Sequence, residues 1–247
     1  MEEKITSIKK LARAGGLLYL IIIITGIFGE LLIKNKIIVS GDPAATAANM
    51  LHYETLWRIG IAGDLLMHVC DVPLMVIFYL LLKPVNKHLA LIAVLFNLVQ
   101  TAAMVATKVN LAQSLFTLGT ADYLKAFPPN QLHTLSYLSI RSDEYGFGIG
   151  LLFFGFECLI LGYLIFKTGY LPKMIGVLMQ IAGVCYITNS LTMIIAPGIA
   201  ALLFPPIMLP PFIAETSFCL WLILKGVNVP KWKEKMMLGE QLLTAQQ

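Results

Sequence analysis

The chain has 247 residues, of which 58% are hydrophobic and 13% charged, and its mean hydropathy is +0.80. A soluble domain carries about 25% charged residues, so this composition excludes an ordinary soluble protein and requires extensive contact with lipid. The net charge of +4 would suit an acidic partner, but the basic residues gather at the ends of apolar runs. That distribution is a signal of membrane topology, and we expect no nucleic-acid partner.

Six apolar segments are long enough to cross a bilayer, which takes about 20 residues. They are continuous rather than alternating, so they predict helices and not the strands of a barrel. The predicted fold class is therefore all-α integral membrane, a six-helix transmembrane bundle in contact with the lipid bilayer. Its spans cover residues 15–33, 59–82, 89–109, 146–166, 172–195 and 207–225.

The positions of lysine and arginine predict that both termini are cytoplasmic (N-in/C-in). Of the 18 basic residues, twelve then lie in cytoplasmic segments, as the positive-inside rule requires. The other six lie in outer segments: Lys34, Lys36, Arg58, Lys108, Lys125 and Arg141. No linker divides the chain, so we expect a cytoplasmic segment over 1–14, a transmembrane domain over 15–226 and a cytoplasmic tail over 227–247, in the cell membrane.

Prolines mark where helices begin near the outer surface. Asp42 followed by Pro43 is typical of an N-cap with proline in the first helical turn, and residues 44–56 are compatible with a helix that continues into the second span. The proline pairs at 205–206 and 210–211 interrupt the sixth span, so we expect its regular helix to begin near Pro211. That start could lie below the lipid surface, where irregular backbone is tolerated only if protein covers it or water reaches it.

The second outer connection, residues 110–145, also predicts helix. Apolar residues recur at helical spacing up to the break at Pro128 and Pro129, and a short helix is expected from His133 towards Arg141. Amphipathic helices of this kind lie on a membrane surface or cover a cavity. The outer connections are therefore predicted to carry amphipathic helices.

The second span carries the densest group of residues that lipid disfavours. Asp64, His68 and Asp71 stand at positions i, i+4 and i+7, which places them within about 60° on one helix face. A charged residue in mid-membrane costs about 2.5–3.5 kcal/mol, so three such residues need an explanation. Glu54 and Arg58 form an i, i+4 pair nearer the outer surface.

The other spans add polar groups at comparable depth. Since such groups almost always face the interior of a bundle, we expect a polar core with an outward-facing cavity. Asp64, His68 and Asp71 would form its centre, with Glu157 and Glu215 opposite and Arg58 near the mouth. The candidate binding residues are Asp64, His68, Asp71, Glu157, Glu215, Arg58, Gln100 and Glu30.

The candidate core is too acidic to neutralise itself, and this imbalance directs the functional interpretation. The leading interpretation is binding or transport of a small polar or cationic solute, with proton coupling as one form of it. One alternative is an intramembrane metal-dependent enzyme with ligands from Asp64, His68, Asp71 and Glu157. A second is a regulatory or assembly protein whose polar core only fixes helix packing. The sequence identifies no catalytic residue, cofactor or oligomeric state.

Several stretches of the sequence resemble the bacterial membrane family catalogued as domain of unknown function 4386. They are Arg13–Tyr19 with Gly26 and Glu30, Gly41–Asp42 with Thr46–Asn49, Glu54–Gly60 with Asp71 and Leu82–Val85, Leu161–Lys167, Gly169–Gly176, Gly183–Tyr186, and Glu215 with Leu220–Gly226. The stretch Gly169-Tyr-Leu-Pro172 is the most specific of these. The resemblance spans about 8–226 and implies a multi-pass protein of the prokaryotic cytoplasmic membrane. It implies no particular activity.

Overall fold

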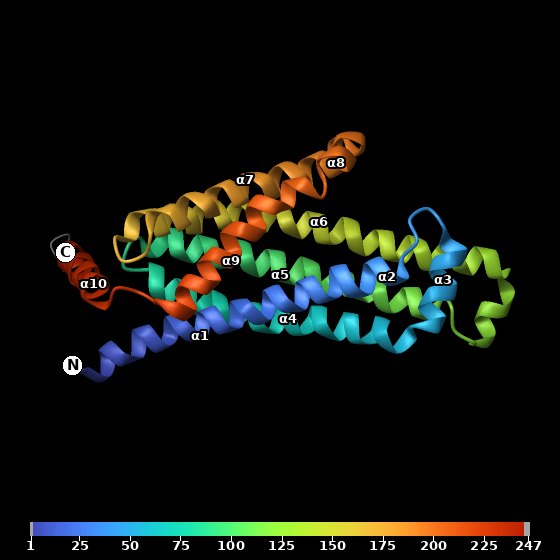
Figure 1. Cartoon of the computed structure of the whole chain (residues 1–247), viewed down its shortest axis with the longest axis horizontal. Coiled ribbons are helices and arrows are strands. Elements are labelled where there is room, and N and C mark those ends of the chain that lie inside the picture. The colour runs from blue at the N-terminus through green and yellow to red at the C-terminus, as the bar shows by residue number, and fades with distance from the viewer. Residues whose placement is uncertain (1, 245–247) are drawn as a thin grey trace. The chain divides into compact units, whose positions relative to one another are not determined.

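The computed structural model describes the backbone of residues 2–244 and the side chains of residues 8–238, and within that range the regular structure is entirely helical. In chain order the elements are α1 (Glu2–Ile27), the π-helix η1 (Phe28–Lys34), α2 (Asn35–Ile37), α3 (Pro43–His52), α4 (Glu54–Leu82), α5 (Lys87–Phe116), the 3-10 helix η2 (Asp122–Ala126), α6 (Pro129–Thr168), α7 (Lys173–Ile195), α8 (Pro197–Leu203), the 3-10 helix η3 (Pro206–Met208), α9 (Leu209–Leu224) and α10 (Val229–Thr244) (Figure 1).

Six helical segments are long and apolar enough to cross a membrane, which confirms the predicted fold class. They are Ile8–Ile37, Glu54–Leu82, Lys87–Phe116, Pro129–Thr168, Lys173–Ile195 and Pro206–Leu224. Each contains most of one predicted span, and several extend well beyond it. Hydropathy marks where lipid contact ends, whereas a helix continues until its backbone meets a break.

The outer connections differ from the prediction in where the helices end. α3 begins as expected, with the Asp42 side chain accepting a hydrogen bond of 2.9 Å from the Ala45 amide. It does not continue into α4, because the backbone turns at Tyr53 (φ −111°, ψ 32°). The short helix expected near His133 is the first part of the 40-residue α6, since Pro129 starts a helix that nothing interrupts before Thr168.

The sixth span begins close to the predicted point. α9 starts at Leu209, so Pro210 and Pro211 occupy its first turn, where their missing N–H groups cost no helical hydrogen bond. The segment before it is broken into α8 and η3.

The described chain forms two compact units. Unit 1 comprises residues 2–20, 70–101 and 149–244, and unit 2 comprises residues 21–69 and 102–148. The divisions fall inside α1, α4, α5 and α6, so each of these helices contributes one stretch to each unit. No linker marks the boundaries.

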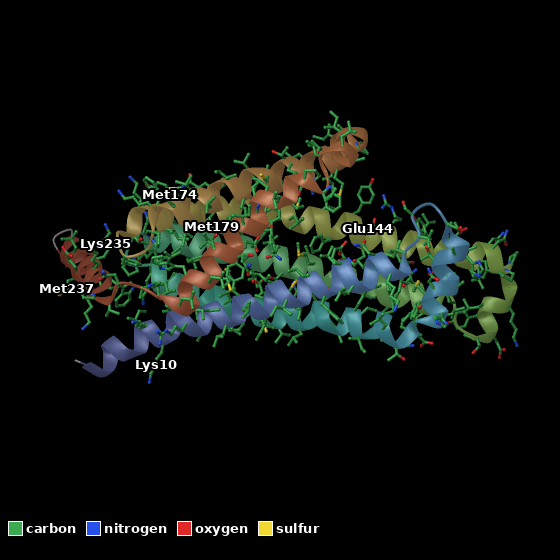
Figure 2. All side chains as sticks on the ribbon, in the orientation of Figure 1. Lys10, Glu144, Met174, Met179, Lys235 and Met237 are labelled. Atoms are coloured by element: carbon green, nitrogen blue, oxygen red, sulfur yellow. The ribbon has the colours of Figure 1, made fainter. Side chains whose placement is uncertain are left out.

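Helices α6 and α7 of unit 1 pack closely against each other. A Cβ atom on Gly162 would lie 2.6 Å from the Gly176 carbonyl oxygen, so the backbones of α6 and α7 touch there. Small residues permit such contacts between membrane helices. α7 turns Met179 inward (1% exposed) and Met174 outward (67% exposed) (Figure 2).

Unit 2 has an apolar core around Trp57. The Trp57 ring is buried, and its Nε1 atom donates a hydrogen bond of 3.3 Å to the Leu111 carbonyl oxygen. The core consists of Ile33, Ile37, Met50, Trp57, Leu111, Leu115 and Ile140. These residues come from η1, α2, α3, α4, α5 and α6. The same apolar core therefore packs against both helical segments of unit 2, η1 and α4, that carry candidate binding residues.

A hydrogen-bonded lock joins three segments of unit 1 at the Leu81 carbonyl oxygen. The Tyr170 hydroxyl donates to it at 2.6 Å and Trp232 Nε1 donates at 3.1 Å. The Asn228 amide in turn donates to the Tyr170 carbonyl at 3.2 Å. Gly169 precedes Tyr170 and has a φ of +74°, a left-handed backbone conformation that residues with a side chain rarely adopt. Burial raises the pKa of the Tyr170 hydroxyl, which keeps it a donor.

The region around Lys9 in α1 and the end of α9 lie on one side of unit 1. A Cβ atom on Gly226, just after α9, would lie 3.3 Å from Cγ of Lys9 in α1. The first and last spans therefore have their terminal ends at the same surface, as an even number of spans requires. That this surface is cytoplasmic stays a prediction from the positive charges.

Replacing Tyr170 with phenylalanine should destabilise the protein by about 1 kcal/mol, because the Leu81 carbonyl loses a buried hydrogen bond but keeps the one from Trp232. Thermal unfolding of the purified protein in detergent measures this. Tyr163→Phe is the matched control, since Tyr163 is 45% exposed on α6. Equal unfolding midpoints for both variants would show that the lock contributes nothing.

Candidate functional site

An ion network lies inside unit 2. The Lys108 ammonium contacts Asp143 Oδ1 at 3.0 Å, Asp143 Oδ2 at 3.2 Å and Asp64 Oδ2 at 3.2 Å. Lys34 lies 3.0 Å from Glu30 and 3.9 Å from Asp143 Oδ2. Asp143 is fully buried and Lys108 is 4% exposed. Four helical segments, η1, α4, α5 and α6, are thereby joined through buried charges.

Close backbone contacts set the geometry of this network. A Cβ atom on Gly29, in η1, would lie 3.1 Å from Asp64 Oδ1, so the carboxylate packs directly against the η1 backbone. The Thr107 hydroxyl lies 3.0 Å from Asp143 Oδ1. A Cβ atom on Gly146 would lie only 2.0 Å from Thr107 Cγ2, so α5 and α6 meet there at the closest spacing that glycine allows.

The buried charges of unit 2 balance. Asp64 and Asp143 are negative, Lys34 and Lys108 are positive, and the fifth member, Glu30, is 55% exposed. The i, i+4 pair of Glu54 and Arg58 predicted from the sequence is present, exposed and 2.7 Å long. The cation that pairs with Asp64 is Lys108. The ion network therefore needs no external cation.

His68 is the one member of the predicted face in unit 2 that the network leaves unsatisfied. It is 3% exposed, and Nε2 has no hydrogen-bond partner among the described residues. A pocket of about 10 Å³ lies beside Asp64 and Lys34, which is room for about one water molecule. It is far smaller than the roughly 300–1,000 Å³ of a solute site.

Asp143 and the role of Lys108 were missed by sequence reasoning. The sequence placed Lys108 in an outer segment and Asp143 in the connection over residues 110–145. A signal was present, because Asp143, Gly150 and Glu157 recur every seven residues and so share one helix face. That face became visible only when α6 proved to be continuous through residue 143.

A second polar cluster, the acid site, lies inside unit 1 and contains Asp71, Glu157 and Glu215. Asp71 accepts a hydrogen bond of 2.6 Å from the Thr101 hydroxyl and one of 3.1 Å from Asn97 Nδ2. Asn97 Nδ2 also lies 3.1 Å from Gln100 Oε1. The Tyr186 hydroxyl donates to Glu215. All the donors to Asp71 and Glu215 are neutral groups.

Glu157 is the exceptional member of the acid site. It is fully buried, and within the described part of the chain neither of its carboxyl oxygens has a hydrogen-bond partner. Its charge is close enough to interact with those of Asp71 and Glu215, and the Asn97 amide lies nearby. None of the three acids forms a salt bridge with any described residue. The surplus negative charge expected from the sequence therefore gathers in unit 1.

The residues predicted as one centre thus belong to two clusters with different partners. Glu30, Arg58, Asp64 and His68 lie in unit 2, whereas Asp71, Gln100, Glu157 and Glu215 lie in unit 1. Within the described part of the chain, no three His, Cys, Asp or Glu side chains are grouped closely enough to hold a metal ion. The geometry therefore gives the metal-dependent alternative no support.

The sequence pattern of a family described as Domain of unknown function (DUF4386) matches residues 14–226. The chain belongs to this family. The match confirms the predicted resemblance and contains both the ion network and the acid site. No curated protein and no solved structure matches the chain. The six apolar helices make the chain a multi-pass membrane protein, and membership of the DUF4386 family assigns no activity, so the function has to be argued from the two clusters.

Replacing Asp143 with asparagine should destabilise the protein by about 3–5 kcal/mol, because Lys108 loses its bidentate partner while it stays buried. Unfolding in detergent measures the loss. Asp122→Asn makes the same chemical change in an exposed pair with Lys125 and should leave the midpoint nearly unchanged. If both variants unfold like the wild type, the network does not hold unit 2 together.

Replacing Gly146 with alanine should disrupt the same network sterically, since the new methyl group overlaps Thr107 and pushes it away from Asp143. A lower unfolding midpoint is expected. Gly63→Ala is the control, because a Cβ atom at that helical position meets nothing within 4 Å. Thr107→Ser keeps the hydroxyl and removes the clashing Cγ2, so adding it to Gly146→Ala should restore much of the loss. Failure of this rescue would contradict the steric explanation.

Proposed function

We propose that the protein binds a small cationic solute at the acid site and exchanges it for a proton during transport across the membrane. The single observation that carries the proposal is Glu157, a fully buried carboxyl group that has neither a hydrogen-bond partner nor a salt bridge among the described residues. An uncompensated buried charge costs several kcal/mol or more. The charge of Glu157 must therefore be compensated by a proton or by a bound cation.

A proton and a cation compete for Glu157. A proton on Glu157 occupies the same oxygens that a cation would contact, so the binding of one opposes the binding of the other. Linkage requires the effect to be reciprocal, and cation binding then releases protons. Asp71 and Glu215 interact electrostatically with Glu157 and have only neutral donors, so their charges would add to the attraction of a cation at Glu157.

The neighbours of the acid site favour an organic cation over a bare metal ion. Tyr19 lies beside Glu215, and its ring packs edge-on against Phe78 and Phe218 at 5.9 Å and 6.2 Å. Aromatic faces attract ammonium groups, and they bind the apolar substituents of such groups as well. Helices α1, α4, α5, α6, α7 and α9 each contribute a residue to this site, which suits a protein whose helices rearrange around a cargo.

The proposal also covers the membrane in which the protein lies and the side on which its termini lie. The basic residues favour a cell membrane with both termini in the cytoplasm. The alternative of a purely structural polar core suits the ion network of unit 2, where the charges are balanced, better than it suits the acid site.

Proton release tests the proposal. Purified protein in weakly buffered detergent solution is titrated with methylammonium, tetramethylammonium or sodium chloride while a dye reports pH. At saturation the wild type should release about one proton per chain to an ammonium ion, and more readily than to sodium. Glu157→Gln should release none, because its amide carries no exchangeable acid proton. Glu54→Gln makes the same change at an exposed pair and should behave like the wild type.

Thermal unfolding shows whether Glu157→Gln is still folded when it releases no protons. If Glu157 is held neutral by a proton, the amide of Glu157→Gln resembles its resting form, and the unfolding midpoint should change little. Equal proton release from Glu157→Gln and from the wild type would remove the basis of the proposal, as would a folded wild type that releases no protons to any of the three cations.

A further inference from the structure

Within the last span of unit 1, Pro206–Leu224, the regular α-helix α9 is shorter than the membrane is thick. α9 has 16 residues, so it is about 24 Å long against a hydrocarbon thickness of about 30 Å. With Lys225 at one surface, the helix begins about 6 Å inside the hydrocarbon on the other side. Glu215 stands ten residues before Lys225, which places it about 15 Å deep, near the middle of the membrane.

The backbone that completes this crossing is irregular and poorly covered. α8 and η3 contain no buried residue. The proline pairs at 205–206 and 210–211 supply no N–H groups, so carbonyl oxygens around them lack helical donors. Lipid tails cannot satisfy those carbonyls, and irregular backbone at membrane depth persists only where protein covers it or water reaches it. Protein covers this segment only in part, on the side that faces α7, so we assign water as the partner of these carbonyls.

The second half of α7 packs against the same segment and is polar. α7 contacts α8, η3 and α9 (Figure 1). The span Lys173–Ile195 has a mean hydropathy of 1.5, the lowest of the six. Ser190 is fully buried, yet its hydroxyl has no hydrogen-bond partner and does not bond the carbonyl one turn earlier, as a serine in a helix commonly does. Buried hydroxyls without a protein partner are satisfied by water.

Ser190 lies one turn beyond Tyr186, whose hydroxyl donates to Glu215. Asn189 adds a second polar side chain at 9% exposure. We infer that Asn189, Ser190, α8, η3 and the start of α9 line a hydrated path from the membrane surface opposite Lys225 to Glu215. The path admits water and small hydrophilic cations. What it serves rests on the proposed function, whereas its hydration stands on the geometry alone.

Chemical labelling of introduced cysteines tests the path. Ser190→Cys and Asn189→Cys are compared with Val184→Cys and Leu191→Cys, which replace exposed apolar residues on the same helix (55% and 42% exposed). Each is made in a Cys185→Ser background, and the three remaining buried cysteines give the baseline. A membrane-impermeant thiosulfonate reagent, which reacts with hydrated thiolates, is applied to sealed vesicles of both orientations.

Cysteines at 189 and 190 should react at least tenfold faster than those at 184 and 191, and only from the surface opposite Lys225. Reaction as slow as that of Val184→Cys from both surfaces, or reaction from the Lys225 side alone, would overturn the inference. The two proposals can fail separately. Fast labelling without proton release leaves the path and removes the cation exchange, whereas proton release without labelling does the reverse.

Methylammonium supplies a second readout on the same variants. If the path leads to the acid site, reaction of Ser190→Cys with the bulky reagent should slow proton release to methylammonium at least tenfold. The same treatment of Leu191→Cys should leave the rate unchanged. Unaltered release from a fully labelled Ser190→Cys protein would show that cations reach Glu215 by another route.

Discussion

A bilayer supplies no counter-ions, so every charge inside this chain must be compensated by the chain itself, by water or by a ligand. Unit 2 meets this constraint internally. Two lysines face two aspartates at 3.0–3.9 Å, and the fifth ionised group, Glu30, is half exposed. Such a network contributes less to net stability than its contacts suggest, but the loss of one member leaves a buried charge unpaired. The ion network thus fixes the register of four helical segments.

Unit 1 meets the constraint differently. Its three acids accept hydrogen bonds from hydroxyl and amide groups or from nothing at all, and no lysine or arginine of the described chain pairs with them. A chain that needed only structural polar contacts could replace Glu157 with an apolar residue of similar volume at no cost. The contrast between the two units suits a packing role for the ion network and leaves the acid site for the proposed cation.

Much of the fold could be predicted from the sequence, because hydropathy and proline positions act locally. The six spans, the Asp42 cap and the late start of the sixth helix follow from runs of neighbouring residues. The site could be predicted only in part. Asp64 and Asp71 share one helix face, yet Asp64 pairs with Lys108 and Asp71 accepts from Thr101. Which helix lies opposite each residue is a tertiary fact that no local pattern contains.

Some of the stretches that carry the family resemblance shape the fold, and others contain residues of the acid site. Gly41, Gly169 and Gly226 all have positive φ, so their stretches shape turns, and Gly169-Tyr-Leu-Pro172 builds the lock at Leu81. Asp71 and Glu215 lie in other stretches and belong to the acid site. The most specific local motif therefore builds part of the fold, while Glu157, the residue on which the proposed function rests, stands outside every one of these stretches. In a membrane protein, an uncompensated charge can locate the function where motif matching cannot.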